Sequence, residues 1–439
     1  MEAAREMNYA DYQAMYQDKL GTVDDCLDCI ETGDILCPAG NLCEPVEILS
    51  NIQKIVPRVE NIEILRAKGI PYPVYRMPEM RDKIDVVSHF FEPGVREGYK
   101  NGLVTFYPCH LHDYLPVRYR HRKANVFLAA CTPMDENGNF LVSGEMLFET
   151  EAIEAADKIL LEVNPALPRI KGSIEINITQ VTRLTEVTTP LFIVPRSIPT
   201  EIDKAVGGYA SELIKDGDCI QIGIGGMPDT IASNLFHRHD LGLHTEMFSS
   251  YVGDLIEAGV INGSKKNVDT GLHIGSFVLG DQKLFDILES NPNVRILPAK
   301  YTNDPFNIAK IDNMVSVNSA LEVDITGQIC SESIGPTQWS GEGGAFEFAY
   351  GVSQSKGGRG IITLPSTAAK GTVSRIKATL TPGAVVTIPR SIADNVVTEY
   401  GVARLSGRSV RERVNNLIAV AHPDFRGELR AEARKLGYL

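Results

Sequence analysis

Short apolar segments alternate with longer amphipathic segments along most of the 439-residue chain. The apolar segments are mostly rich in β-branched residues and often bounded by Gly, Pro or Asp, as buried strands are. Their alternation with helical patterns predicts an α/β fold with largely parallel sheets. The clearest expected strands are 126–130, 159–163, 219–222, 361–364 and 384–388, and the clearest helices are 201–215 and 410–421.

Two distant segments, 30–35 and 214–219, share one pattern: a helix end closed by Gly, then Asp, then a strand. This echo has two interpretations. It is either turn chemistry common in α/β proteins or the trace of two related halves. A proline-marked stretch over 190–199 lies between the two segments. We therefore predict an N-terminal domain over 1–195 and a C-terminal domain over 196–439.

The net charge and the apolar content limit the kinds of partner that the protein can bind. The chain carries 56 acidic against 43 basic residues, a net charge of −13, which argues against nucleic acid as the main partner. The longest apolar runs are too short to span a membrane, and residues 1–6 lack the apolar core of a signal peptide. We expect a soluble cytoplasmic protein that binds no nucleic acid and no membrane.

Two clusters have residue types that can bind metals. Cys26 and Cys29 form one C-x-x-C, but a zinc site would need a second pair or nearby histidines. We expect reduced thiols on one helical turn. His110 and His112, with Asp113, would need a further donor on the same side. A strand-to-loop edge that lines a substrate cleft is the favoured interpretation, and we predict no metal site.

A glycine-rich run follows the expected strand 219–222 and precedes an expected helix. Backbone amides at such a junction can face an anion or a carbonyl oxygen. Pro228 stands where a dinucleotide fingerprint needs its third glycine, so that site is poorly supported. A tight turn without a ligand is an equal alternative. The run consists of Gly223, Ile224, Gly225, Gly226 and Met227, before Pro228.

Glu246 is a lone carboxylate within the apolar segment 242–248. Most glutamates are solvated surface charges, but a carboxylate in a partly dry pocket can serve as a covalent nucleophile. Two later glycine-rich stretches, 340–344 and 356–360, are expected to be loops at strand ends, where α/β proteins bind ligands. Lys356, Arg359 and Lys370 near them form either a solvated basic patch or anchors for a phosphate or carboxylate.

Six segments in order resemble the acyl-CoA:carboxylate CoA-transferase family, which includes 4-hydroxybutyrate and butyrate CoA-transferases. The chain is also similar to the related acetyl-CoA hydrolases. The N-terminal half resembles the family more loosely, at 132–138 and 161–164. The six segments are 223–228, 241–247, 327–335, 340–344, 397–403 and 418–425.

The resemblance implies two similar open α/β/α domains with the active site between them. It assigns Glu246, in the family's G-x-H-[ST]-E-M pattern, as a nucleophile that carries CoA as a glutamyl-CoA thioester in ping-pong kinetics. CoA thioester is then a substrate, and no permanently bound cofactor is expected. The resemblance places CoA contacts at the glycine-rich run, at Gly344 and at Lys370, with the Gly225 and Gly226 amides as candidate oxyanion donors.

The residues leave other functions open. Water could intercept the glutamyl-CoA, which would make the protein an acyl-CoA hydrolase such as an acetyl-CoA hydrolase. A non-catalytic CoA-binding protein is the other alternative. We expect a homo-oligomer, either a dimer or a tetramer, because most soluble oligomers are closed and symmetric.

One departure from the family pattern concerns substrate choice. Family members often have Gly-Gly-Gln followed by an Asp-Phe pair, but Ala345 stands here in place of the glutamine. The lost amide would leave room that Phe346 could cap, with Arg359 nearby as a counter-ion. Our hypothesis is a shift from butyrate or 4-hydroxybutyrate toward a short dicarboxylate such as succinate or itaconate.

Overall fold

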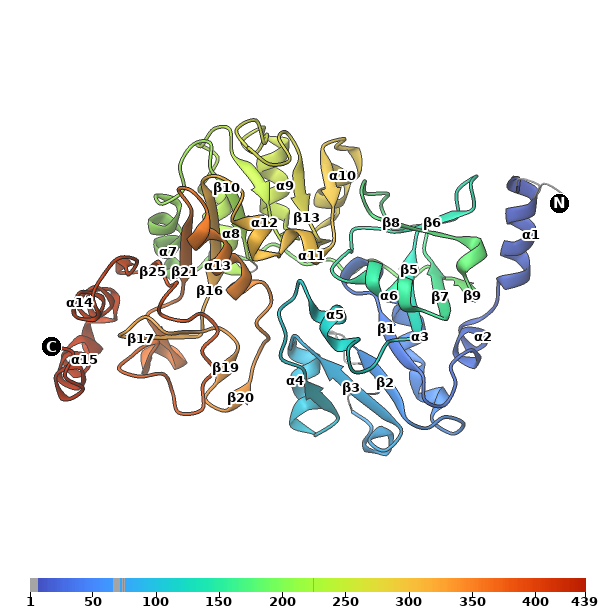
Figure 1. The fold of residues 1–439 in the computed structure, drawn as a ribbon, viewed down its shortest axis with the longest axis horizontal. Coiled ribbons are helices and arrows are strands. Elements are labelled where there is room, and N and C mark those ends of the chain that lie inside the picture. Colours follow the sequence, from blue (N-terminus) through green and yellow to red (C-terminus); the bar gives the residue numbers. More distant parts are fainter. Residues whose placement is uncertain (1–6, 66–71, 73, 75, 224) are drawn as a thin grey trace.

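Two open sheets lie side by side in the computed structural model, which describes residues 7–65, 72, 74, 76–223 and 225–439 (Figure 1). The first sheet has seven strands, all parallel, in the order β4-β3-β2-β1-β5-β7-β9. They are β1 (Ile35–Pro38), β2 (Ile62–Leu65), β3 (Ile84–Ser88), β4 (Val104–Phe106), β5 (Val126–Cys131), β7 (Lys158–Val163) and β9 (Arg183–Glu186).

The second sheet has eight strands in the order β15-β13-β11-β10-β16-β21-β25-β26, and only the β25–β26 pair at its edge is antiparallel. They are β10 (Cys219–Ile222), β11 (Gly242–His244), β13 (His273–Gly275), β15 (Val294–Ile296), β16 (Met314–Ser319), β21 (Arg359–Thr363), β25 (Asn395–Thr398) and β26 (Gly401–Arg404). The α/β class with largely parallel sheets is therefore confirmed.

The two sheets follow the same path. Each begins with a central strand, β1 or β10, adds three strands outward on one side, and then returns to build the other side. The echo seen in the sequence precedes these two central strands, and its glycines, Gly33 and Gly217, both adopt positive φ, 88° and 79°. The shared strand order favours two related halves over local turn chemistry.

A buried ion pair is repeated at the amino ends of the strands in both halves. Asp34, before β1, pairs with Lys158 at the start of β7, with 3.0 Å between Oδ2 and Nζ. Asp218, before β10, pairs with Arg359 at the start of β21. Because β7 and β21 hold equivalent places in the two sheets, both pairs tie the central strand to the strand two places away.

Helices cover the sheets, and two terminal helices lie at the far left of Figure 1. The capping box at Thr200 and Asp203 starts the first helix of the second half. The helices are α1 (Tyr9–Lys19), α2 (Val23–Asp28), α3 (Val46–Ser50), α4 (Pro93–Lys100), α5 (Tyr114–Arg118), α6 (Glu149–Ala155), α7 (Glu201–Ser211), α8 (Gly226–Ser233), α9 (Ser250–Glu257), α10 (Gln282–Ser290), α11 (Ala299–Thr302), α12 (Pro305–Ile308), α13 (Ala345–Gln354), α14 (Val410–Val420) and α15 (Pro423–Lys435).

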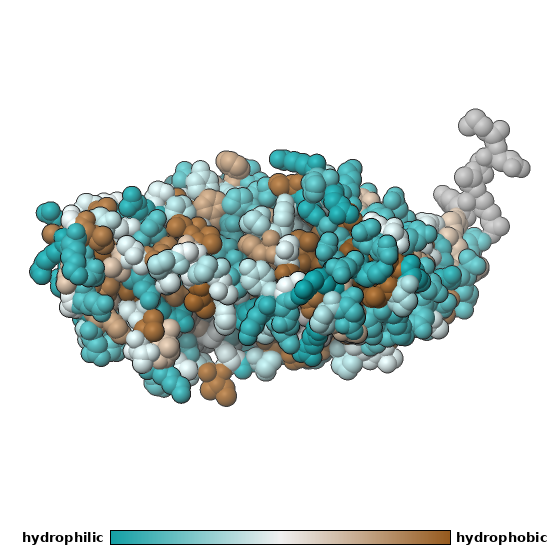
Figure 2. Space-filling model, turned by 90° about the horizontal axis from the view of Figure 1, so that it is seen from below, coloured by the Kyte–Doolittle hydropathy of each residue, from teal (hydrophilic) through white to brown (hydrophobic). Residues whose placement is uncertain are grey.

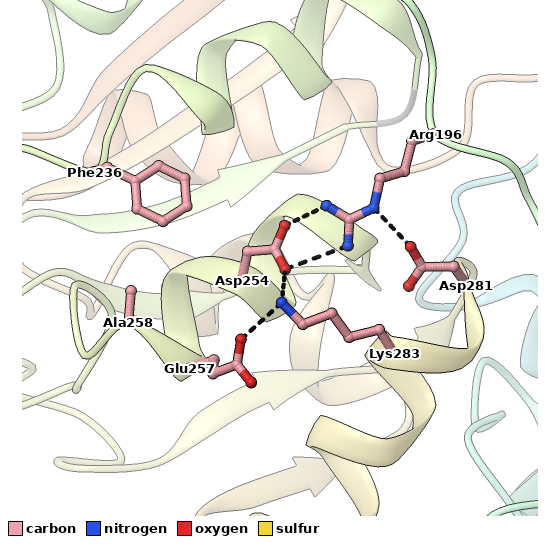
Figure 3. Close-up of a pocket in the computed structure, with 7 residues that line it drawn as sticks. All are labelled: Arg196, Phe236, Asp254, Glu257, Ala258, Asp281 and Lys283. Atoms are coloured by element: carbon pink, nitrogen blue, oxygen red, sulfur yellow. Dashed lines mark hydrogen bonds and ion pairs between the residues drawn. The ribbon is translucent and has the colours of Figure 1, made fainter.

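An extended segment, 187–200, joins the two halves where the sequence suggested a boundary. Its Arg196 is fixed to the second half, donating to Asp281 at 2.7 Å and pairing with Asp254 (Figure 3). Lys283 also pairs with Asp254, at 2.8 Å. The shallow surface hollow of about 600 Å³ around these side chains is thus formed by charges that bind one another.

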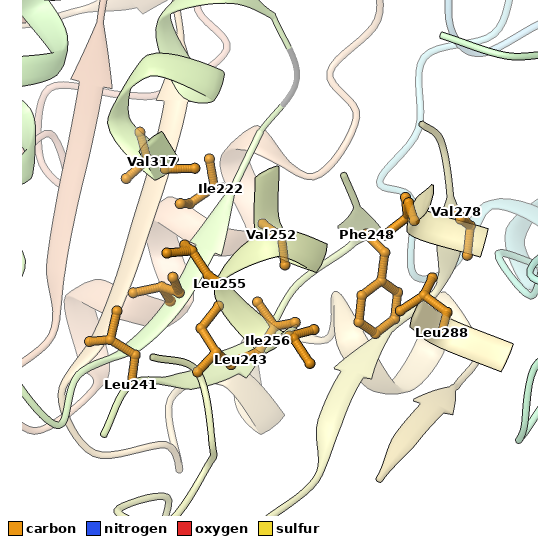
Figure 4. Packing of buried hydrophobic residues seen from close by; sticks show 14 of the residues in the cluster. Ile222, Leu241, Leu243, Phe248, Val252, Leu255, Ile256, Val278, Leu288 and Val317 are labelled. Atoms are coloured by element: carbon orange, nitrogen blue, oxygen red, sulfur yellow. The ribbon is translucent and has the colours of Figure 1, made fainter. Parts of the chain in front are cut away.

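The largest core cluster lies in the second half. Leu243 of β11 packs in one cluster with Val252 and Leu255 of α9 (Figure 4). Met146 and Ile170 of the first half belong to the same cluster. The two halves therefore share part of one core, which fixes their relative position.

Most of the expected elements are confirmed, since β5, β7, β10, β21, α7 and α14 overlap their predicted ranges. The strand expected over 384–388 is wrong. Its Val385 and Val386 are 43% and 41% exposed, and only Ile388 forms an isolated bridge, to Ile329. Gly383, at φ 85°, turns the chain immediately before this run.

Several other expectations concern the surface and the thiols. All eight cysteines, each within the described part of the chain, carry free thiols, and Cys26 and Cys29 lie in and next to the short helix α2. Figure 2 shows a face on which polar and apolar residues are interspersed. Among the helices that the structure describes, none is both long and apolar enough to cross a membrane.

Candidate active site between the two halves

A cavity of about 450 Å³ opens where the carboxyl ends of both sheets meet. In the second half, Ile222 and Asn318 line it from the ends of β10 and β16, where the strand order changes direction. In the first half, Asn41 follows β1 and His89 follows β3. Ligands of open α/β sheets bind at such switch points, and here two of them face one space.

Glu246 lines this cavity from a break between two short strands. β11 ends at His244, and β12 (Met247–Phe248) then pairs with β14 (Phe277–Val278). The Glu246 carbonyl accepts hydrogen bonds from the backbone N–H groups of Ser276 at 2.8 Å and Phe277 at 3.1 Å. The main chain of the candidate nucleophile is therefore held in place, and its side chain extends into the cavity.

Asn303, which follows α11, holds the Glu246 carboxylate. Its Nδ2 donates to Glu246 Oε2 at 2.8 Å and to Glu347 Oε2 at 2.9 Å. Its Oδ1 accepts from the Thr302 hydroxyl at 2.9 Å, and this contact turns the amide nitrogen toward the two carboxylates. Both Asn303 and Glu347 are fully buried.

Gly344 lies against the same carboxylate at the start of α13. A Cβ at this position would be 2.2 Å from Glu246 Oε2 and 2.6 Å from Asn303 Nδ2. Only glycine fits between these atoms. The stretch 340–344 was expected to be a ligand-binding loop, and its residues all line the cavity. The N-terminal end of α13, which carries partial positive charge, therefore approaches Glu246.

Ala345 and Phe346 take different places although they are neighbours. Ala345 lines the cavity beside Gly344, and its expected effect on substrate choice stays a prediction. Phe346 instead stacks on His110, with ring centres 5.1 Å apart, and on Tyr350, at 5.9 Å. It supports the histidine rings, and the described cavity wall does not include it.

His110 and His112 extend from the first half to acidic residues of the second. The His110 Nδ1 is 2.9 Å from Glu342 Oε1, and the His112 Nδ1 is 2.6 Å from Glu347 Oε1. The two imidazole rings stack with centres 6.0 Å apart. Residues 107–113 form the irregular segment that follows β4, and Leu111 of this segment lines the cavity, so it lies at a strand-to-loop edge beside the cavity as expected. Over the described residues, no group of three or more His, Cys, Asp or Glu could hold a metal ion.

The carboxylates favour the charged form of both histidines. The hydrogen bond to Glu342 raises the pKa of His110 to about 9, against the opposing effect of burial. Burial lowers the pKa of His112, but the hydrogen bond and charge of Glu347 outweigh it, so this pKa is also raised. Burial raises the pKa of Glu342, and His110 opposes that rise. At neutral pH His110 is therefore a cation paired with Glu342 across the boundary, and the charged form of His112 is favoured by Glu347 in the same way.

The glycine-rich run reaches the cavity only in part. Gly223 lines it, whereas Ile224 lies outside the described residues. Gly225, with φ 116°, precedes α8, and Gly226 and Met227 form its first turn. The described cavity wall does not include these three residues. Their expected roles in CoA binding and as oxyanion donors stay predictions.

Arg359 lies at the wrong end of the sheet for its expected role. It begins β21, whereas the cavity lies beyond the carboxyl ends of the strands. Four strand steps separate it from Thr363, about 13 Å. Its guanidinium pairs instead with Asp218. The counter-ion role is therefore wrong. Lys370 is exposed on the hairpin beyond the other end of β21, so the two do not cluster, and its role stays a prediction.

Arg96 and Trp339 are cavity residues that sequence reasoning missed. Arg96 of α4 lies over the Trp339 ring, 3.9 Å from its centroid, and its Nε donates to the Trp339 carbonyl at 2.6 Å. This contact joins the two halves at the cavity wall. The remaining wall is largely apolar. Its apolar side chains include Phe90, Phe91, Leu111, Leu147, Phe277, Leu279 and Leu321.

Asn303 and Glu347 were also missed. Glu347 stands within the altered Gly-Gly-Ala-Phe-Glu-Phe stretch, where a longer acid in place of the family's usual Asp was the available signal. Asn303 lies in an irregular polar stretch between α11 and α12, and no local pattern distinguishes it.

Known protein families and relatives match most of the chain. The acetyl-CoA hydrolase/transferase N-terminal domain matches residues 1–197, and the C-terminal domain matches residues 280–433. A succinyl-CoA:cyclohexane-1-carboxylate CoA transferase from Geobacter metallireducens is 38% identical over 97% of each chain. A 4-hydroxybutyrate coenzyme A transferase from Clostridium kluyveri is 36% identical over 97% of this chain and 99% of its own.

Solved structures resemble the model closely. RipA from Yersinia pestis superposes with a TM-score of 0.92 at 32% identity, covering 98% of this chain and all of the other. A 4-hydroxybutyrate CoA-transferase from Porphyromonas gingivalis superposes with a TM-score of 0.81 at 32% identity, covering 97% and 100%. The overall fold is thus one that these related chains share.

Proposed function

The chain belongs to the acetyl-CoA hydrolase/transferase family and is a CoA-transferase that acts on carboxylates, and we propose that it works through a covalent glutamyl-CoA thioester on Glu246. The observation that carries this proposal is the setting of Glu246. Its carboxylate lies in a largely apolar cavity, accepts a hydrogen bond from Asn303 and touches Gly344 at the start of a helix.

The covalent route needs two exchanges at one carboxylate. A Glu246 oxygen attacks the thioester carbonyl of acyl-CoA, the carbon–sulfur bond breaks, and a mixed anhydride and CoA thiolate result. The thiolate then attacks the Glu246 carbonyl carbon, which releases the first acid and leaves glutamyl-CoA. An incoming acid repeats these steps in reverse and leaves with CoA. Each exchange forms one bond and breaks one, so the thioester energy is conserved.

The contacts of Glu246 suit the charge that develops on it. When thiolate adds to its carbonyl carbon, negative charge builds on the remaining oxygen. Asn303 Nδ2, which already donates to Oε2, supplies a preorganised donor at that oxygen. A single donor of this kind typically accounts for about 10²- to 10³-fold in kcat.

The cavity wall supports acids with an apolar chain. Its side chains are mainly aromatic and aliphatic, and Arg96 is the one Arg or Lys among the described residues that line it. The Arg96 guanidinium is already stacked on Trp339. Since Arg359 does not reach the cavity, the dicarboxylate hypothesis loses its counter-ion. We therefore place monocarboxylates such as butyrate and 4-hydroxybutyrate ahead of succinate and itaconate, with Ala345 leaving room beside Glu246.

Mass spectrometry tests the covalent step. Protein incubated with butyryl-CoA should gain a CoA adduct on the Glu246 peptide, and Glu246→Ala should lose it. A surface control, Glu212→Ala on the exposed end of α7, should keep it. Failure of the wild-type protein to form an adduct, while CoA still transfers, would show that the route does not pass through Glu246.

Two further assays separate the alternatives. Measuring CoA release with and without an acceptor acid distinguishes transfer from hydrolysis. Equal rates in both would favour an acyl-CoA hydrolase. Comparing kcat/KM for butyrate, 4-hydroxybutyrate, succinate and itaconate tests the acid class. A dicarboxylate preferred by tenfold or more (about 1.4 kcal/mol) would contradict the apolar-chain assignment.

A further inference from the structure

We propose that His112 is a positioning residue for the nucleophile, acting across the boundary between the two halves through Glu347 and Asn303. This inference rests on the proposed role of Glu246 and adds a residue that does not touch the cavity. His112 belongs to the first half, whereas Glu347, Asn303 and Glu246 belong to the second. The nucleophile would thereby be sensitive to how the halves are docked.

A continuous set of hydrogen bonds joins His112 to Glu246. The His112 backbone N–H donates to Glu347 Oε1 at 2.8 Å, and its ring Nδ1 lies 2.6 Å from the same oxygen. The other Glu347 oxygen accepts from Asn303 Nδ2 at 2.9 Å, and that nitrogen also donates to Glu246 at 2.8 Å. One side-chain amide is thus shared by two carboxylates, and one histidine holds the farther carboxylate at two points.

The negative charges of Glu246 and Glu347 explain why a cation is needed at the His112 end of these hydrogen bonds. Two carboxylates that share one amide donor repel each other, and a cation nearby offsets that repulsion. Glu347 is fully buried, so water cannot screen it. If Glu246 bound a proton to relieve the repulsion from Glu347, it would lose its nucleophilicity. A cationic His112 balances Glu347 and leaves the Glu246 charge available.

The surroundings of His112 favour that cation. Asp113 beside it and Asp304 of the second half add their negative charge to that of Glu347, and together they outweigh the cost of burial. His110, stacked at 6.0 Å, is paired with its own acid, Glu342. The pKa of His112 is therefore raised above its ordinary 6.5, and its charge persists to a higher pH than that of a free imidazole.

The same contacts matter after Glu246 has been acylated. Its oxygen is then a neutral carbonyl that holds the amide less strongly, whereas Glu347, fixed by His112, still holds Asn303. The donor stays aimed at the oxygen for the second attack. Because His112 is absent from the described cavity wall, its loss should reduce the rate of the chemical steps and leave substrate binding nearly unchanged.

The test compares His112→Asn with the neighbouring His110→Asn. Asparagine places its Nδ2 near the position of the ring Nδ1, so the hydrogen bond to Glu347 survives without the charge. Single-turnover formation of the CoA adduct from butyryl-CoA is measured from pH 6 to 10. Because butyryl-CoA supplies the CoA, no free thiol is added whose own ionisation would change the rate with pH. We expect the wild-type rate to fall as rising pH removes the His112 charge, and His112→Asn to be slower by about 10- to 100-fold at pH 6 without that alkaline fall.

The control removes the neighbouring imidazole that stacks on His112 but lies outside the set of hydrogen bonds. His110 contacts Glu342, and among the described residues no hydrogen bond joins Glu342 to Asn303. His110→Asn should therefore retain the alkaline fall. In both variants the KM for butyryl-CoA should change less than about threefold. Glu347→Gln should also lower the rate, because a neutral amide oxygen holds the Asn303 amide less strongly than a carboxylate does.

Several results would overturn the inference. It fails if His112→Asn matches the wild-type rate, or if its alkaline fall persists. A wild-type protein that forms no adduct refutes the proposed function instead, so the two failures are distinct. Should the variants not fold, NMR of protein labelled with [¹³Cε1]-histidine decides. The His112 pKa must lie above 6.5 in the wild type and move lower in Glu246→Gln, because that change removes a nearby negative charge and lets Asn303 bind Glu347 more tightly; an unchanged value refutes the coupling.

Discussion

Replacing Gly344 by alanine is the sharpest test of the site geometry. The added Cβ would lie 2.2 Å from Glu246 Oε2, 2.6 Å from Asn303 Nδ2 and 3.1 Å from Phe348 Cδ2. Ordinary contacts of this kind are about 3.5 Å. The carboxylate, the amide or the start of α13 must therefore move by more than about 1 Å.

The expected loss follows from that displacement. A misplacement of about 1 Å in an active site can cost about 10²-fold in rate. The effect on folding should be smaller, because overpacking costs about 1–3 kcal/mol while Gly-to-Ala replacement recovers about 0.4–1 kcal/mol from the unfolded chain. The backbone at Gly344, φ −89° and ψ 8°, also suits alanine. Activity should therefore fall far more than stability.

The assay is kcat/KM for CoA transfer from butyryl-CoA, together with the melting temperature. Gly208→Ala in α7 is the matched control, since a Cβ there meets nothing within 4 Å. It should keep full activity and gain up to about 1 kcal/mol of stability. A folded Gly344→Ala protein with activity within about threefold of the wild type would refute the close packing of Gly344 on Glu246.

Three further predictions follow from other contacts. Asn303→Asp would bring a third carboxylate to Glu246, and kcat should fall by at least about 10²-fold; a smaller fall in steady-state assays contradicts its role as donor. Arg359→Met leaves Asp218 unpaired, so denaturant unfolding should show a loss of about 3 kcal/mol, with the ranking of acids unchanged; a changed ranking would restore the counter-ion hypothesis. Burial raises the pKa of Glu162 to about 8, so the folded state holds a proton that the unfolded chain releases near 4.5. Stability should then decline as pH rises from 4.5 to 8, by up to about 1.4 kcal/mol per unit, and Glu162→Gln should flatten the decline.

The sequence was most informative where burial acts on consecutive residues. Strand β10 was expected over 219–222 and is found there, because a buried parallel strand requires an unbroken apolar run. The helix–Gly-Asp–strand echo marked the central strand of each sheet, since the positive φ at Gly33 and Gly217 favours glycine. Local composition misled at 384–388, where β-branched residues follow a turn and lie partly exposed.

Only those site residues that stand in a recognisable local motif could be predicted from the sequence. Glu246 and Gly344 stood in recognisable stretches, but the residue that joins them to Glu347 did not. Asn303 is 57 residues from Glu246 and 44 from Glu347, and the His112–Glu347 pair spans 235 residues. Contacts of this separation depend on how the two sheets are docked, which no local periodicity records.

The error at Arg359 and the inference at His112 have one physical origin. In a parallel sheet all strands point the same way, so a charge at a strand start and a charge just past a strand end lie on opposite edges. Asp34–Lys158 and Asp218–Arg359 occupy the amino edges and repeat in both halves, as expected for contacts that fix strands. Glu246, which follows β11, lies at the carboxyl edge of its sheet. His112, which follows β4 in the other half, is joined to Glu246 through Glu347 and Asn303. Because those two edges face each other only when the halves are docked, a histidine from one half can control the charge of a carboxylate in the other.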